Sequence, residues 1–129
     1  TLTRFRQELL RGGFDASHQH NFAQRKELAT FALKCSDVAH STKHFDLHVN
    51  WTLRINAEFF HQGDTERDKG MACSPFCDRT NINVAESQRG FYSFIVCPLF
   101  QAMDEHLGGR IQHEVLRQMD RNMQFWKRY

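Results

Sequence analysis

An amide side chain and an aromatic ring, Gln88 and Phe91, lie three residues apart in a segment with helical periodicity. This spacing places both side chains on the same helical face. A glutamine amide presents an acceptor and a donor in one plane, so it can bond the edge of a purine while the nearby ring stacks on the base. Alone the pair is a weak signal, because a glutamine one turn from a phenylalanine is usually helix surface beside core.

A carboxylate ends an apolar helical run about fifty residues earlier. Asp37 closes the run that begins at Leu28, and an imidazole, His40, follows three residues later. An aspartate in such a place offers a hard oxygen ligand for Zn²⁺ or Mg²⁺. The residue pattern by itself favours a plainer interpretation, in which Asp37 caps the following turn.

Three histidines, His40, His44 and His48, follow one another at four-residue steps. On one continuous helix they would stack three imidazoles that could hold zinc. However, Asp46 is a natural N-cap, so the triplet is expected to straddle a loop and a helix start. Exposed or hydrogen-bonded histidines are therefore favoured over a zinc site.

Composition limits the classes of function. The 129 residues suffice for one domain or part of one, and 40% hydrophobic residues with twelve Phe predict a real core. Seventeen basic and fifteen acidic residues are interspersed, which predicts no nucleic-acid partner. The longest apolar stretch, 91–100, is half a membrane span, so no membrane contact is expected from this segment. Four cysteines lack CxxC spacing and no signal peptide is visible, which favours a cytoplasmic protein, although an anchor elsewhere in a longer parent would not show here.

Helical periodicity runs through the whole chain and no alternating strand pattern is found, so the predicted fold is all-α, a compact helical bundle. The first helix carries an apolar stripe in 2–10 and is expected to end at Gly12–Gly13. Asn21 and Gln24 fit a capping box that opens a second helix, which buries one face, and 36–44 breaks the helical pattern. That face comprises Leu28, Phe31, Ala32 and Cys35.

Three further elements follow. A helix from about 47 to Gly63 carries an apolar stripe at four-residue steps, and 64–80 should be an irregular, mobile loop. A helix over about 84–104 should kink at Pro98, and Gly108–Gly109 precede a last amphipathic helix. The expected stripes are Leu47, Trp51, Ile55 and Phe59; then Val84, Gln88, Phe91, Ile95 and Leu99; and finally Ile111, Val115, Met119, Met123 and Trp126.

Four segments, 33–40, 51–64, 71–78 and 87–100, together resemble the C-terminal half of class I cyclic-nucleotide phosphodiesterases. The resemblance covers about 32–100 and continues more loosely to Trp126. It implies that 1–129 is the C-terminal portion of one larger, all-helical catalytic domain, and that the parent hydrolyses cAMP, cGMP or both to 5′-monophosphates.

The resemblance also implies roles for individual residues. Asp37 matches a metal ligand and Gln88 the purine-binding glutamine, while Thr52 would orient that amide. Two departures from the family stand out, because His40 replaces a frequent asparagine and His48 a frequent tyrosine. The other residues implied to form the nucleotide pocket are Phe91, Ile55, Phe59, Val38, Phe76 and Trp51.

The implied reaction uses two divalent ions, Zn²⁺ and Mg²⁺ (or Mn²⁺), roughly 4 Å apart, to activate a water, and an acid that protonates the departing oxygen. The family's HNxxH…HD ligands and its general-acid histidine are absent from this sequence. No catalytic residue is therefore assigned here, and the segment alone is predicted to be inactive. The sequence does not decide between adenine and guanine, because one orientation of the Gln88 amide suits each base.

Two other interpretations remain open from the residues. The chain could be a non-catalytic helical nucleotide-binding or regulatory module, or a purely structural bundle with Asp37 and Gln88 on its surface. Both nucleotide interpretations require these two side chains to open onto one cleft. The helix bearing Met119, Met123 and Trp126 is in addition a candidate homodimer surface.

Overall fold

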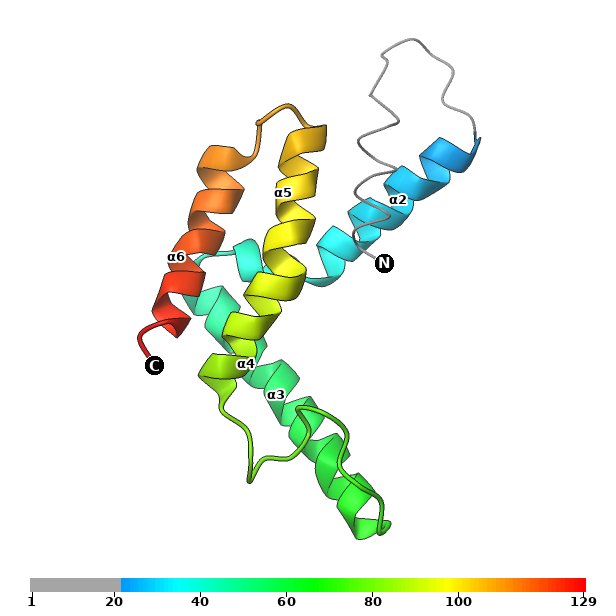
Figure 1. Cartoon of the computed structure of the whole chain (residues 1–129), viewed down its shortest axis with the longest axis vertical. Helices are drawn as coiled ribbons and strands as arrows, with labels where there is room; N and C mark the ends of the chain where they lie inside the picture. Colours follow the sequence, from blue (N-terminus) through cyan, green and yellow to red (C-terminus); the bar gives the residue numbers. More distant parts are fainter. Residues whose placement is uncertain (1–21) are drawn as a thin grey trace.

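The computed structural model describes residues 22–129, and all regular structure in this part is helical, with no strand. The helices are α2 (Phe22–Asp37), α3 (Phe45–Asp68), α4 (Val84–Phe91), α5 (Cys97–His106) and α6 (Arg117–Trp126), arranged as in Figure 1. The all-α prediction is thus confirmed. The predicted stripe in 2–10, its glycine stop and the Asn21 cap lie outside the described residues. None of the described helices is long and apolar enough to cross a membrane.

Helices α4 and α5 form one rod joined by a π-helical turn, Tyr92–Val96. The rod begins where the Asn83 side chain accepts a hydrogen bond from the Glu86 N–H at 3.0 Å, a normal N-cap. Proline cannot donate a backbone hydrogen bond, and the π turn lies directly before Pro98, at the start of α5. The predicted helix over 84–104 is therefore present, with a change of helical pitch just before the proline.

The rod α4–α5 and the segment from Gln112 to Trp126 run side by side and in opposite directions (Figure 1). Gly108 and Gly109 join them in left-handed conformation, with φ of 66° and 81°, which glycine adopts without a steric cost. The predicted break is at these residues. A second π-helical turn, Gln112–Leu116, leads into α6.

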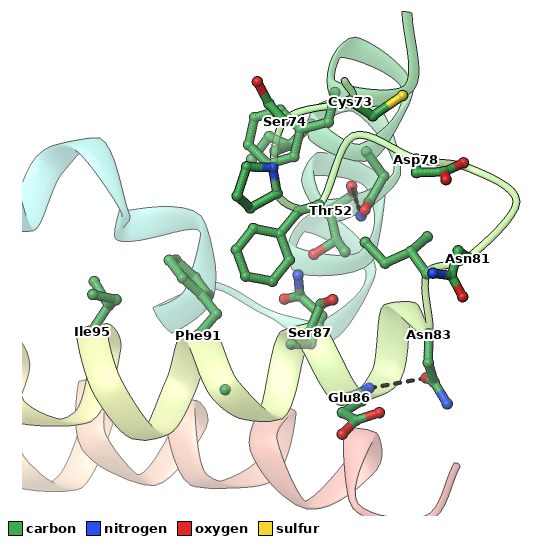
Figure 2. A pocket seen from close by; sticks show the side chains of 18 of the residues that line it. Thr52, Cys73, Ser74, Asp78, Asn81, Asn83, Glu86, Ser87, Phe91 and Ile95 are labelled. Atoms are coloured by element: carbon green, nitrogen blue, oxygen red, sulfur yellow. Dashed lines mark hydrogen bonds between the residues drawn. The ribbon is translucent and has the colours of Figure 1, made fainter. Parts of the chain in front are cut away.

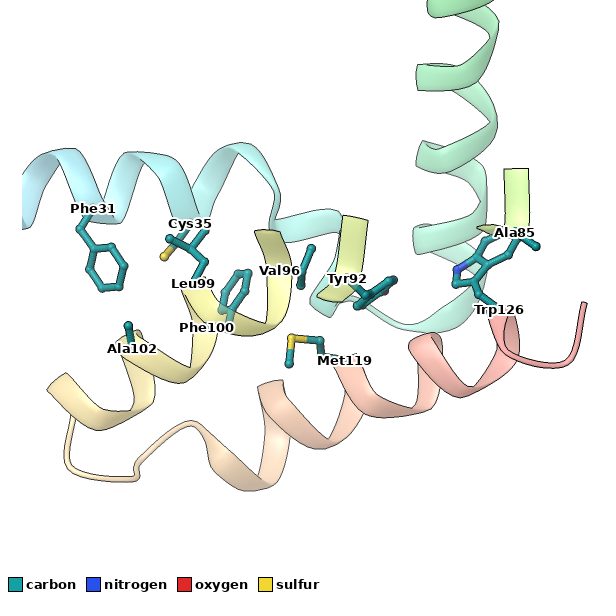
Figure 3. Close-up of a cluster of buried hydrophobic side chains, with 10 residues drawn as sticks. All are labelled: Phe31, Cys35, Ala85, Tyr92, Val96, Leu99, Phe100, Ala102, Met119 and Trp126. Atoms are coloured by element: carbon teal, nitrogen blue, oxygen red, sulfur yellow. The ribbon is translucent and has the colours of Figure 1, made fainter. Parts of the chain in front are cut away.

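The hydrophobic core lies between α2, the rod α4–α5 and α6 (Figure 3). Its fully buried members are Phe31, Tyr92 and Val96. Cys35 is also buried, as predicted for α2, whereas Ala32 is exposed. Met119 and Trp126 belong to the same core, so the face suggested as a homodimer surface packs against the chain's own helices instead.

Helix α3 differs most from its prediction. It continues five residues past Gly63 to Asp68, and Leu47, Trp51 and Phe59 of the expected apolar stripe are exposed. The buried side of α3 is polar and is formed by His48, Thr52, Asn56 and Gly63. The four-residue period was correct, but the inward face is offset by one residue.

Gly63 is a packing position and does not end α3. A methyl group there would overlap the backbone carbonyl of Cys77, so only glycine lets the loop 69–83 approach the helix this closely. The loop folds back along the lower half of α3 (Figure 1). The segment predicted as a mobile loop is thus helical up to Asp68 and packed against α3 afterwards.

Candidate functional site

A cavity of about 1140 Å³ opens between α3, the rod α4–α5 and the loop 69–83. Phe91 and Ile95 project into it from the rod, below the loop residues Cys73 and Ser74 (Figure 2). Ile55 and Phe59 form an apolar part of the cavity wall on α3. Largely apolar clefts with a few polar groups are typical of small-molecule sites.

Two polar atoms in this cavity are buried and have no hydrogen-bond partner among residues 22–129: the Gln88 amide oxygen and the Thr52 hydroxyl. Leaving such an atom unpaired costs roughly 1–3 kcal/mol. The opposite, backbone side of Thr52 is satisfied, since the Asn56 amide donates to the Thr52 carbonyl at 2.8 Å. The unpaired atoms are therefore suited to a polar ligand that enters between the apolar walls.

Asp37 lies at the same cavity, at the end of α2. Its carboxylate makes no ion pair or hydrogen bond with the described residues, so its oxygens are available to a divalent cation. It is nevertheless a single ligand, because no three His, Cys, Asp or Glu side chains within 22–129 come together as a metal site. The His40, His44 and His48 triplet is not one either, since His44 is exposed at the start of α3.

The outer wall of the cavity is fastened to α3 through Glu66. Its carboxylate accepts from the Ser74 N–H at 2.6 Å, the Ser74 hydroxyl at 2.7 Å and the Gln62 amide at 2.8 Å. These bonds, the Ser74 backbone first, lower the pKa of Glu66. The next residues carry Phe76 to the cavity in a left-handed conformation, φ 69°, which a phenylalanine rarely adopts.

Ion pairs fasten the rest of the loop. Asp64 pairs with Arg79 and with Arg67, and Arg67 also bonds Asp78 at 3.0 Å. Each of these groups is substantially exposed, so a single pair contributes little. Together with the Glu66 bonds to Ser74, they hold the loop to α3 on both sides of Phe76.

His40 and His48 lie next to each other, although on different elements. His40 sits on the short 3₁₀ turn Ala39–Thr42 and lines the cavity. His48 is completely buried behind it, and its Nδ1 is 3.3 Å from the Nδ1 of His40. Burial, and secondarily the neighbouring His40, lowers the pKa of His48 to about 4, and burial lowers that of His40. Both rings are neutral near pH 7.

The structure brings together most of the residues singled out from the sequence. The cavity is lined by Asp37, Val38, His40, Thr52, Ile55, Phe59, Phe76, Gln88 and Phe91. Two do not reach it. Trp51 is 49% exposed, with the Arg54 guanidinium over its ring, and His48 acts only through His40.

Sequence analysis also missed lining residues, among them Asn56, Ser87 and Ile95. Ile95 had been placed only in a helical stripe. Asn56 could have been found, because His48, Thr52 and Asn56 repeat every four residues as a polar face on one helix. A polar face on an otherwise amphipathic helix indicates a buried network or a site.

The chain is similar to known proteins of one family. The family model for 3′5′-cyclic nucleotide phosphodiesterase matches residues 1–119. The dual specificity calcium/calmodulin-dependent 3′,5′-cyclic nucleotide phosphodiesterases 1B of Bos taurus and Mus musculus are each 41% identical over 81 residues, which cover 63% of this chain and 15% of theirs.

The structure of LmjPDEB1 in complex with IBMX superposes with a TM-score of 0.83 at 29% identity, over 98% of this chain and 37% of that one. The chain thus matches only a small part of the length of its relatives. The helical fold agrees with this match. Because the family model covers residues 1–119, this chain belongs to the 3′5′-cyclic nucleotide phosphodiesterase family.

Proposed function

We propose that residues 1–129 form the C-terminal portion of a catalytic domain that hydrolyses 3′,5′-cyclic nucleotides, cAMP or cGMP or both, to 5′-monophosphates. In this role the chain supplies the purine pocket and one metal ligand. The observation that carries the proposal is the shared cavity, with the unpaired Gln88 amide oxygen between apolar walls and the Asp37 carboxylate at the same opening. The buried Gln88 oxygen and the opening of both residues onto one cavity also argue against a purely structural bundle.

The base is held by the walls and the amide. Ile55 and Phe91 would contact the two faces of the ring system, and such stacking contributes roughly 1–3 kcal/mol per base. The Gln88 amide would bond the purine edge, and the unpaired Thr52 hydroxyl is the candidate for fixing its orientation. If nothing else fixes that amide, it can turn to suit either purine.

The phosphate end depends on groups that this part of the chain does not contain. Two divalent ions, Zn²⁺ with Mg²⁺ or Mn²⁺, supply the Lewis acidity that such a hydrolysis uses when they are bound. Asp37 would hold one of them through a carboxylate oxygen. The remaining ligands and the general acid would have to come from outside the described residues.

Hydrolysis of cAMP and cGMP by the longer protein, with Asp37→Ala beside it, tests the proposal. We expect turnover of at least one nucleotide and a loss of two or more orders of magnitude in kcat for Asp37→Ala. Asp46→Ala is the matched control, because Asp46 is an exposed aspartate on α3 away from the cavity. A folded, metal-loaded protein that binds the nucleotides without cleaving them would instead identify a non-catalytic binding module.

A further inference from the structure

A line of hydrogen-bonding side chains runs from the core to the cavity and joins three elements. It begins at Trp126 of α6, whose indole nitrogen is 2.8 Å from Nε2 of His48 on α3. It continues from Nδ1 of His48 to Nδ1 of His40, 3.3 Å away on the 3₁₀ turn. Trp126 and His48 are both buried, and only His40 reaches the cavity.

The direction of the first bond is fixed by chemistry. An indole N–H can only donate, so Nε2 of His48 must accept and carries no proton. The Tyr92 hydroxyl lies 3.4 Å from the same nitrogen but donates to the Ser41 carbonyl at 2.9 Å. A neutral imidazole has one ring proton. His48 therefore carries its proton on Nδ1, the nitrogen that faces His40.

The direction of the bond between His48 and His40 follows from the first bond, because His48 donates from Nδ1. The two imidazole rings are 12° from parallel and their centroids are 5.4 Å apart. That separation is nearly the Nδ1–Nδ1 distance plus two ring radii, so the rings meet edge to edge and the shared proton lies close to both ring planes. Nδ1 of His40 must then accept, and the proton of His40 is left on Nε2.

We infer that Trp126 and His48 are positioning residues that fix the tautomer of His40, so that His40 presents an Nε2–H donor to the ligand cavity. The inference rests on the proposed function for the identity of the ligand. A fixed Nε2–H donor on His40 favours a base that places a hydrogen-bond acceptor opposite it and disfavours a base that places a donor opposite it. Both purines carry such an acceptor at N7, whereas an asparagine side chain would offer either a donor or an acceptor.

Histidine ¹⁵N NMR of the 129-residue chain reads the tautomers directly, without nucleotide, metal or turnover. At pH 7 we expect the proton of His48 on Nδ1 and that of His40 on Nε2, with the two signals assigned from His40→Gln and His48→Gln. The opposite tautomer at either residue, or rapid exchange between both tautomers, would overturn the inference.

Trp126→Phe keeps an aromatic ring in the core and removes only the N–H. In this variant, with helicity unchanged by circular dichroism, we expect His48 and His40 to populate both tautomers. Tyr129→Phe is the matched control, because it removes an exposed aromatic donor three residues later and should leave the tautomers unchanged. Unaltered tautomers in folded Trp126→Phe would contradict the positioning role. If Trp126→Phe does not fold, the tautomers of His48 and His40 in the wild-type spectrum decide the inference.

The consequence for the ligand is measured in the longer protein. Trp126→Phe should raise KM for a cyclic purine nucleotide about fivefold, the usual worth of one hydrogen bond, with kcat little changed. Equal KM values for Trp126→Phe and Tyr129→Phe would overturn the claim that the tautomer serves binding. A protein that binds no cyclic nucleotide at all would refute the proposed function, while the NMR result would still decide the tautomers.

Discussion

Gln88 and His48 show how a single side chain can be polar and buried for different reasons. The Gln88 amide oxygen has no partner within the described residues, which is a cost that a ligand can remove. His48 is fully buried and its two nitrogens both have partners, so its network is complete in the free protein. The first residue is proposed to bind a ligand and the second to hold a neighbouring side chain.

Replacement of Gln88 by Ala tests the binding role at the residue scale. In the longer protein we expect KM or Kd for the cyclic nucleotide to rise about 10-fold to 100-fold, in keeping with roughly 1–3 kcal/mol for an amide lost from a buried edge. The effect on kcat should be smaller, because the proposed contact of the amide is with the base and not with the phosphate. Gln101→Ala, on the exposed side of α5, should behave as wild type, and a Gln88→Ala protein with unaltered KM would contradict the assignment.

Acid should destabilise the chain through His48. Its pKa is lowered to about 4 in the folded state by burial, against about 6.5 when unfolded. Between these values the unfolded state binds more protons, so stability falls as the pH drops from about 6.5 to about 4, by up to about 3 kcal/mol. Urea unfolding at several pH values measures this slope. The slope should shrink in His48→Gln and persist in His113→Gln, whose histidine is exposed.

At the scale of elements, α3 serves two functions along its length. Its first half presents the polar face of His48, Thr52 and Asn56 to the rod and the 3₁₀ turn. Its second half is the support for the loop 69–83, through Gly63 and Glu66. The cavity therefore has one wall made of a helix and another made of a loop fastened to that same helix.

Two glycine substitutions separate packing from helix propensity. Gly63→Ala should lower the free energy of unfolding by about 1–3 kcal/mol, because the new methyl must displace the Cys77 backbone. Gly90→Ala lies within α4 with open space around the added methyl, so it should raise stability by about 0.5–1 kcal/mol. Chemical denaturation measures the free energy of unfolding of both variants. A Gly63→Ala protein that is stabilised in the same way as Gly90→Ala would show that the loop does not rest on Gly63.

At the scale of the whole molecule, many large apolar side chains of the described part face solvent. Leu33, Leu53 and Phe94 are 64%, 60% and 76% exposed, alongside Trp51 and Leu47. These side chains come from α2, α3 and the π-helical turn Tyr92–Val96, so the apolar side chains that face solvent are not confined to one element. The buried core lies between α2, the rod α4–α5 and α6.

The 129-residue chain alone should therefore not hydrolyse cAMP or cGMP, even with Zn²⁺, Mg²⁺ or Mn²⁺ added. The reason is that Asp37 is a single ligand and residues 22–129 bring no group of three metal-ligating side chains together. A sensitive nucleotide assay on the purified chain, beside the longer protein, is the check. Turnover above that of an Asp37→Ala chain would show that a complete site exists within these residues.

Helical periodicity was sufficient to predict the all-α fold. Helical spacing also put Gln88 and Phe91 on one face, and both line the cavity, whereas the expectation that Ile55 lies there came from the family resemblance. It failed for Trp51 because periodicity gives the repeat of a helix but not which side faces inward. Gly63 was misread since a helix stop and a close packing contact use the same residue. The link between Trp126 and His48 joins positions 78 residues apart, which no local pattern encodes.

The two tryptophans of this chain occupy opposite environments, with Trp51 half in water and Trp126 buried against an imidazole. Indole emission shifts to longer wavelength in water and is quenched by a protonated imidazole in contact. The short-wavelength part of the fluorescence therefore belongs to Trp126 and reports the charge of His48. The protein carries an intrinsic optical probe of the wall behind its own binding cavity, with Trp51 as the built-in reference signal.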